Sequence, residues 1–137
     1  MLFKTHLASL VLVPLIGIQM SVPATQPQII EVPKELAPTE YIIKYAQEYG
    51  VSEKLLLAVA TCESSLNVEA VNNNEPNNIQ SYGIFQYQKP TWEYFEKKFN
   101  VDLDYYNPED QIKMTAIAFK NGQANHWSCF SKVKGVK

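Results

Sequence analysis

The chain has 137 residues, of which 46% are hydrophobic, 12% aromatic and 19% charged, the composition of one ordinary globular domain. This composition argues against a disordered chain, a collagen-like repeat or a multidomain assembly. Twelve basic residues, all of them lysine, stand against fourteen acidic ones and give a formal net charge of −2. Because a nucleic-acid-binding domain usually shows a basic surface, we expect no nucleic-acid partner.

Residues 1–24 are predicted to be a secretory signal peptide. Met1–His6 carries Lys4 and no acid, an apolar stretch runs from Leu7 to Ile18, and Val22-Pro23-Ala24 resembles a cleavage site. The apolar stretch of about 12 residues is shorter than the ~20 that a transmembrane helix needs. We therefore expect no stable membrane span after cleavage, and an uncleaved anchor is the alternative.

Residues 25–38 are predicted to form a proline-punctuated leader, and residues 39–137 the folded domain. Cys62 and Cys129 are too few for a disulfide framework and have no Cys-x-x-Cys spacing. Export would place both thiols in an oxidising compartment, where thiols tend to pair. One disulfide and two free thiols both remain open at this point.

Four helices are predicted, and the first two have clear boundary signals. Thr39 can cap a helix whose apolar residues follow the 3.6-residue period, and Gly50 stands where a left-handed C-terminal residue belongs. Ser52 can cap the second helix, over residues 53–65. That segment is apolar almost all round, so we expect it to be the buried centre of the domain.

A long polar loop without regular structure is predicted over residues 67–81, followed by an extended strand or tight turn over 82–87. A third helix is predicted over 90–100 from its aromatic stripe. Asn107-Pro108 combines an N-cap residue with proline at the first helical position, so a fourth helix should begin there and stop at Gly122.

Glu63 is the candidate for chemistry. His126 is the only histidine after the predicted signal peptide, so we expect neither a metal site nor a Ser-His-Asp triad, and no cofactor. Helical spacing places Glu63 on the same face as Val59 and Ala60. Apolar surroundings raise the pKa of a carboxyl group, as a general acid requires. A helix-end cap or salt bridge is the alternative, and position alone does not decide between the two.

Three segments, in order, resemble motifs of soluble-lytic-transglycosylase-like (SLT) domains of the lysozyme superfamily. Cys62-Glu63-Ser64-Ser65 resembles the family's Glu-Ser motif, and Tyr82-Gly83-Ile84-Phe85-Gln86 resembles its Gly-Leu-Met-Gln motif. Ala118-Phe119-Lys120-Asn121-Gly122 falls where the family has Ala-Tyr-Asn-Ala-Gly. The similarity continues to Trp127-Ser128-Cys129 and covers roughly residues 39–130.

The resemblance implies a mainly α, small lysozyme-like helical domain with an irregular or short β segment around residues 80–88. It also implies a monomeric lytic transglycosylase acting on peptidoglycan glycan strands outside the cytoplasm, in the periplasm or beyond the cell. Glu63 would protonate the oxygen of the β-1,4 bond between N-acetylmuramic acid (MurNAc) and N-acetylglucosamine (GlcNAc), and would then act as a base. Two alternatives are a lysozyme-type hydrolase, with water as acceptor, and a non-catalytic glycan-binding or envelope scaffold module.

The resemblance further implies substrate-binding or site-orienting roles for the residues Ser64, Tyr82, Gly83, Gln86, Tyr87, Phe119 and Asn121. The family's tyrosine, whose hydroxyl lies near the catalytic carboxyl, has no clear counterpart, because Phe119 or Lys120 falls at its position. Tyr82 or Tyr87 could replace it.

A second carboxylate would be needed for a glycosidase that works with paired acids, in which the two groups lie about 5 to 9.5 Å apart. Glu69, Glu75, Asp102 and Asp104 are the nearby candidates. Nothing in the sequence singles out one of them, and their default interpretation is solvated surface.

Overall fold

The computed structural model describes residue 17, residues 35–76 and residues 78–135. The predicted signal peptide, apart from residue 17, and most of the predicted leader therefore lie outside the described residues. From Glu35 onward, the described residues belong to one compact unit. No helix within the described ranges is long and apolar enough to cross a membrane.

Helix α1 (Pro38–Tyr49) begins two residues earlier than a cap at Thr39 would place it. Its N-cap is Ala37 rather than Thr39, and the Glu40 carboxylate accepts a hydrogen bond of 2.6 Å from the Ala37 N–H. Proline suits the first helical position because its missing N–H would be unpaired there in any case. The predicted C-terminal stop at Gly50 is confirmed, with a left-handed φ of 67°.

Helix α2 (Glu53–Ser64) begins as predicted after Ser52, whose Oγ accepts a hydrogen bond of 3.2 Å from the Leu55 N–H. It ends at Ser65, a left-handed residue whose N–H bonds back to the helix. These two caps fix the length of α2 and therefore the place where the Glu63 side chain leaves it.

Helices α3 (Lys89–Phe99) and α4 (Pro108–Lys120) follow the predicted boundaries closely. Asn100 ends α3 in a left-handed conformation with a φ of 51°. Asn107 caps α4, and its Oδ1 accepts hydrogen bonds of 2.8 and 3.2 Å from two backbone N–H groups of the first turn. The start signal in the sequence is thus confirmed.

The C-terminal segment holds a short 3-10 helix, η1 (Ala124–His126), and helix α5 (Ser128–Val133). The described residues therefore contain five α-helices, where the sequence predicted four. Helices of six residues are not stable on their own in water, so local sequence carries little signal for them. Tertiary contacts described below hold α5 in place.

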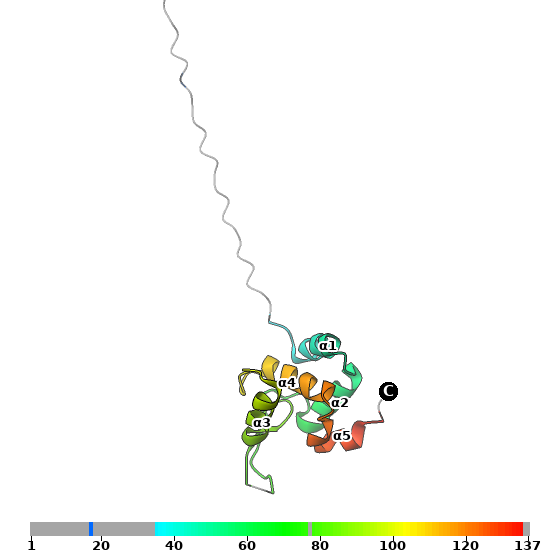
Figure 1. Cartoon of the computed structure of the whole chain (residues 1–137). Coiled ribbons are helices and arrows are strands. Elements are labelled where there is room, and N and C mark those ends of the chain that lie inside the picture. Colours follow the sequence, from blue (N-terminus) through cyan, green and yellow to red (C-terminus); the bar gives the residue numbers. More distant parts are fainter. Residues whose placement is uncertain (1–16, 18–34, 77, 136–137) are drawn as a thin grey trace, which may run out of the picture. The chain divides into compact units, whose positions relative to one another are not determined.

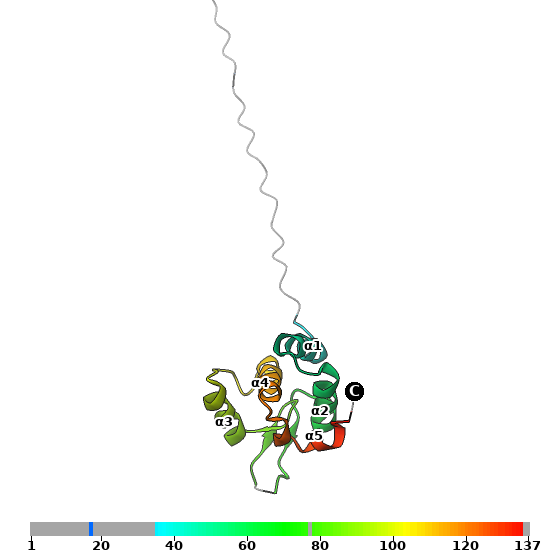
Figure 2. The same cartoon turned by 45° about the vertical axis from the view of Figure 1, so that its right-hand side comes forward.

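Three two-residue strands form an antiparallel sheet in the order β1 (Val71–Asn72), β2 (Ser81–Tyr82), β3 (Tyr87–Gln88). The predicted short β segment around residues 80–88 is confirmed. Strand β1 corrects the prediction of a structureless loop over 67–81, since Val71 pairs with Tyr82 and Asn72 with Ser81. Figure 2 shows the strands between α3 on one side and α2 and α5 on the other.

Helix α4, not α2, is the most buried element, which corrects the sequence-based expectation. Figure 1 shows α4 among the other helices, and α1 packs mainly against it. Only Leu56, Val59 and Ala60 of α2 are buried. The buried residues of α4 are Gln111, Ile112, Met114, Thr115, Ala116, Ile117 and Ala118.

Two polar residues of α4 interrupt its apolar pattern, so the sequence did not indicate that this helix is central. Each of the two side chains has a hydrogen-bond partner in the core. Gln111 Nε2 donates a hydrogen bond of 2.7 Å to the Tyr105 carbonyl oxygen. Thr115 Oγ1 lies 2.8 Å from the Tyr87 hydroxyl. Buried polar groups are tolerated when they are hydrogen-bonded, so α4 can be central without being uniformly apolar.

Replacing Gly83 with alanine should destabilise the domain by about 2–4 kcal/mol, from a left-handed residue and an overpacked contact together. Gly83 has a φ of 81°, and a Cβ there would collide with the Gln111 side-chain amide. Gln111 is 1% exposed and its Nε2 is hydrogen-bonded to the Tyr105 carbonyl oxygen, so the side chain has little room to move away. The measurement is urea denaturation. The control is Gly122→Ala, where φ is 72° in open space, and an equal loss in both variants would contradict the collision.

Candidate active site

A pocket of about 220 Å³ lies where the end of α2, the sheet, the start of α3 and the start of α5 meet. Most of its lining side chains are polar. Of the residues predicted for the site, it brings together Glu63, Gln86 and Tyr87. The complete lining is Glu63, Glu75, Ser81, Gln86, Tyr87, Gln88, Thr91, His126, Trp127 and Ser128.

Glu63 is partly buried, and its carboxylate is held from the C-terminal segment. The Cys129 N–H donates a hydrogen bond of 3.2 Å to Glu63 Oε1. Burial is the main cause that raises the pKa of the Glu63 carboxyl above its ordinary value, and the negative charge of Glu75 raises it further. The hydrogen bond from Cys129 and the positive charge of Lys132 lower the pKa and oppose this shift.

Ser64 orients the end of α2 rather than lining the pocket. Its Oγ donates a hydrogen bond of 2.8 Å to the Ile84 carbonyl oxygen, in the turn between β2 and β3. Ser65 and Leu66 follow with φ angles of 55° and 66°, two successive left-handed residues that are not glycine. The chain therefore turns sharply just after α2, and Glu63 lies in the last turn of that helix.

Gln86 lines the pocket and also holds its wall. The Gln86 amide nitrogen donates hydrogen bonds of 2.8 Å to the Gly83 carbonyl oxygen and 3.1 Å to that of Ala70. Gln86 has a φ of 50°, so its side-chain bonds hold a strained turn. Gly83 packs against Gln111, so its lack of a side chain leaves room for the Gln111 amide in the core.

Neither tyrosine proposed to replace the family's tyrosine directs its hydroxyl at Glu63. Tyr87 lines the pocket, but its hydroxyl bonds Thr115 in the core, and burial raises the pKa of that hydroxyl. Tyr82 packs its ring against Tyr105 and Tyr106, with ring centroids 5.8 and 5.2 Å apart, and lies outside the pocket lining.

Phe119 and Asn121 lie away from the pocket. The Phe119 ring packs against Trp127 and Phe130, with centroids 5.4 and 5.9 Å apart. Asn121 Nδ2 donates a hydrogen bond of 2.8 Å to the Ile117 carbonyl oxygen at the end of α4. The last motif therefore supports the packing of the C-terminal segment.

Trp127 and a disulfide position that segment against α2. Trp127 Nε1 donates a hydrogen bond of 3.0 Å to the Phe85 carbonyl oxygen, and the side chain is buried. Cys62 and Cys129 form a disulfide, with Cα atoms 5.9 Å apart. Because Cys62 precedes Glu63 and Cys129 supplies the N–H that bonds it, the disulfide ties both partners of the Glu63 hydrogen bond together.

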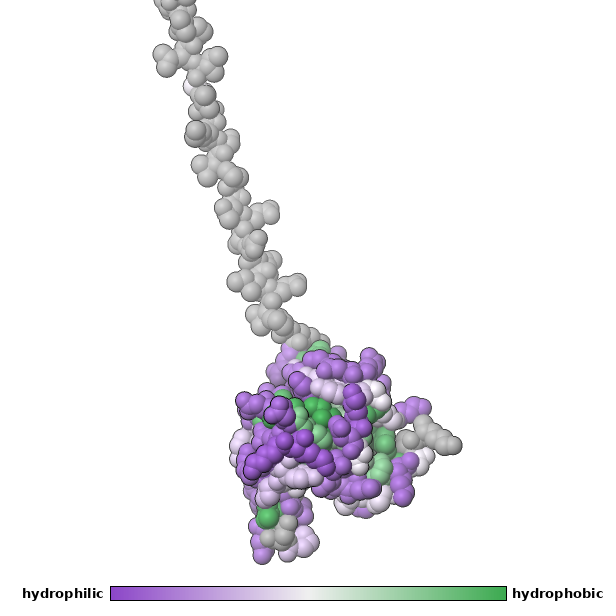
Figure 3. Space-filling view, in the orientation of Figure 1, coloured by the Kyte–Doolittle hydropathy of each residue, from purple (hydrophilic) through white to green (hydrophobic). Residues whose placement is uncertain are grey.

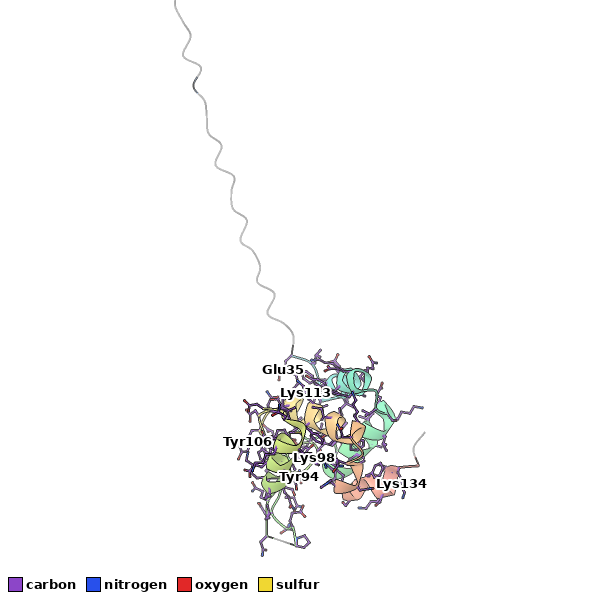
Figure 4. The ribbon with its side chains drawn as sticks, in the orientation of Figure 1. Glu35, Tyr94, Lys98, Tyr106, Lys113 and Lys134 are labelled. Atoms are coloured by element: carbon purple, nitrogen blue, oxygen red, sulfur yellow. A yellow bond between two sulfur atoms is a disulfide. The ribbon has the colours of Figure 1, made fainter. Side chains whose placement is uncertain are left out.

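Sequence reasoning missed several residues of the pocket wall. The His126 ring packs against Phe95, with centroids 4.9 Å apart, and against Tyr94. Figure 4 shows Tyr94 on α3 beside Lys98, whose Nζ donates a hydrogen bond of 2.8 Å to the Tyr94 hydroxyl. The other missed residues are Ser81, Gln88 and Thr91. Glu75 was one of four acids that the sequence did not separate, and Ser128 lies in the segment Trp127-Ser128-Cys129 without a predicted role.

The surface is compatible with a polar polymer as ligand. Figure 3 shows a largely hydrophilic face, with apolar side chains in smaller areas.

A mainly helical domain, with a partly buried glutamate at a helix end beside a short antiparallel sheet, is a lysozyme-like domain. The family model of the transglycosylase SLT domain matches residues 40–129, so the chain belongs to this family. No curated protein matches the chain.

Membership of the family confirms the resemblance of the three motifs and the lysozyme-like fold. It supports a lytic-transglycosylase-like function related to peptidoglycan, and binding of peptidoglycan as substrate.

Proposed function

We propose that the chain is a secreted lytic transglycosylase that cleaves the β-1,4 bond between MurNAc and GlcNAc, with Glu63 as general acid and then general base. The observation that carries this proposal is the partly buried Glu63 carboxyl in a polar pocket, held by the Cys129 N–H. Burial raises its pKa, so a larger fraction of the carboxyl keeps its proton toward neutral pH.

The reaction uses one carboxyl group in two steps. Glu63 first gives its proton to the glycosidic oxygen, and the bond from C1 to that oxygen breaks with its electron pair going to the oxygen. Positive charge then develops on C1 and the ring oxygen of MurNAc. The MurNAc C6 hydroxyl attacks C1 and returns a proton to Glu63, which gives a 1,6-anhydro product without consuming water.

Export is supported by the predicted signal peptide and by the disulfide between Cys62 and Cys129, since disulfides persist in oxidising compartments. Peptidoglycan lies outside the cytoplasm, so an enzyme that acts on it must be exported.

Product analysis tests the proposal. Purified peptidoglycan incubated with the full chain should release muropeptides ending in 1,6-anhydro-MurNAc, which weigh one water less than hydrolysis products by mass spectrometry. Products with only reducing ends would replace the transglycosylase by a hydrolase. Binding to the polymer without any released product would favour a non-catalytic module and overturn the proposal.

A further inference from the structure

Glu75 is the second carboxylate of the pocket that contains Glu63. It lies in the connection between β1 and β2 and is partly buried. Its Oε1 accepts a hydrogen bond of 2.8 Å from Ser81 Oγ and one of 2.9 Å from Asn72 Nδ2. Two side-chain donors on one oxygen fix the position of the carboxylate, which a solvated surface acid does not require.

The sheet supplies both donors. Asn72 of β1 and Ser81 of β2 are directly paired across the strands, and Ser81 is only 2% exposed. Residues directly opposite each other in an antiparallel pair lie close together, so their side chains can reach the same oxygen. The position of Glu75 therefore depends on strand pairing and not on the conformation of an isolated loop.

The other acids considered for a second carboxylate lie elsewhere. Glu69, Asp102 and Asp104 are exposed, and none of them lines the pocket. Asp104 Oδ1 instead accepts a hydrogen bond of 2.8 Å from the Tyr106 N–H. The structure thus distinguishes one acid where the sequence distinguished none.

Glu75 is also close enough to Glu63 to interact with it electrostatically. Its negative charge raises the pKa of the Glu63 carboxyl, and Lys132 of α5 acts in the opposite direction. Tyr87 of β3 and His126 of η1 are the remaining ionisable residues in the pocket lining. Glu63 and Glu75 thus line the same pocket, one from the end of α2 and the other from the connection between β1 and β2.

We propose that Glu75 is a second catalytic residue, whose carboxylate stabilises the positive charge that develops on the sugar ring when the glycosidic bond breaks. The inference rests on the proposed role of Glu63 as the acid. A fixed charge placed where charge develops in the transition state lowers the barrier without reorganisation during the reaction. Glu75 forms no covalent bond and moves no proton, so the proton balance of the two steps is unchanged.

The test is Glu75→Gln in the full chain. Glutamine has nearly the same shape, and its carbonyl oxygen can still accept from Ser81 and Asn72, so the variant removes the charge and keeps the scaffold. We expect kcat on purified peptidoglycan to fall about 100-fold with little change in KM, the size of effect seen when one electrostatic stabiliser is lost. The matched control is Glu69→Gln, which changes the same residue type outside the pocket and should stay within about twofold of wild type.

The pH profile separates a catalytic charge from a structural role. Loss of the negative charge lowers the pKa of Glu63, so the basic limb of kcat/KM should move to lower pH in Glu75→Gln. Glu75→Asp keeps the charge, so it should retain more kcat than Glu75→Gln and an unmoved basic limb. Thermal melting of each variant accompanies the assays.

Two results would overturn the inference: Glu75→Gln with at least half of the wild-type kcat, or Glu75→Asp and Glu75→Gln with equal kcat and equal pH profiles. If Glu75→Gln melts near the assay temperature, its low kcat could come from unfolding. The Glu75→Asp variant then decides, because the proposal requires it to keep activity and an unmoved basic limb. Activity in Glu63→Gln would instead remove the proposed function itself. Inactive Glu63→Gln with active Glu75→Gln would remove only the role of Glu75.

Discussion

Replacing Glu63 with glutamine should lower the turnover of purified peptidoglycan by about 10³- to 10⁴-fold, because one carboxyl group supplies the proton for bond cleavage and later receives one. Glutamine keeps the size of the side chain and can still accept the hydrogen bond from the Cys129 N–H. The loss should therefore appear in kcat rather than in KM. Release of soluble muropeptides, followed by chromatography, measures it.

The matched control is Glu53→Gln, the same change on the same helix. Glu53 is exposed in the first turn of α2, at the opposite end of the helix from Glu63, and lies outside the pocket lining. Its activity should stay within about twofold of wild type. Wild-type turnover in Glu63→Gln would remove Glu63 from the mechanism.

Thermal melting of Glu63→Gln tests whether the fold survives, and the pH dependence of the melting temperature has a definite expected sign. The folded-state pKa of Glu63 is raised above its unfolded value, so the contribution of Glu63 to stability is present below the unfolded pKa and is lost as pH rises through the folded pKa. Glutamine has no such loss. The variant should therefore melt above wild type at pH 8, with no advantage at pH 4, and a lower melting temperature at pH 8 would trace the lost activity to unfolding.

The parts of the fold that could be predicted from sequence are those set by local chemistry. Ser52 and Asn107 cap helices because their side chains accept from nearby backbone N–H groups, and Gly50 ends a helix because it adopts a left-handed conformation without strain. Glu63 could be singled out in the same way, because helical periodicity and the Glu-Ser motif are both patterns of residues close together in the sequence.

The parts that could not be predicted depend on contacts between distant segments. Strand β1 has two residues and no periodic pattern, so neither its pairing with β2 nor the resulting place of Glu75 is visible in the sequence. Helix α4 looked half polar, because the partners of Gln111 and Thr115 come from other elements. Helix α5 is too short for its own signal and depends on Trp127 and the disulfide.

The double variant Cys62→Ser, Cys129→Ser should lose about 3–4 kcal/mol of unfolding free energy. The disulfide closes a separation of 67 residues, and the chain-entropy model assigns such a loop about 4 kcal/mol, an upper figure because native strain subtracts from it. For a domain of this size the loss is a large part of the total stability. Urea denaturation at constant pH measures it, and a change below about 1 kcal/mol would contradict the role of the bridge.

The same variant should also lose activity at temperatures where it remains folded, because the disulfide holds the Cys129 N–H against Glu63. A weakened charge-assisted hydrogen bond of about 1.5 kcal/mol corresponds to roughly a tenfold lower kcat. Reduction of the wild-type chain with dithiothreitol should reproduce both losses, whereas the double variant should not respond to it. Full activity in the folded double variant would show that the bridge is not needed to hold the Cys129 N–H against Glu63.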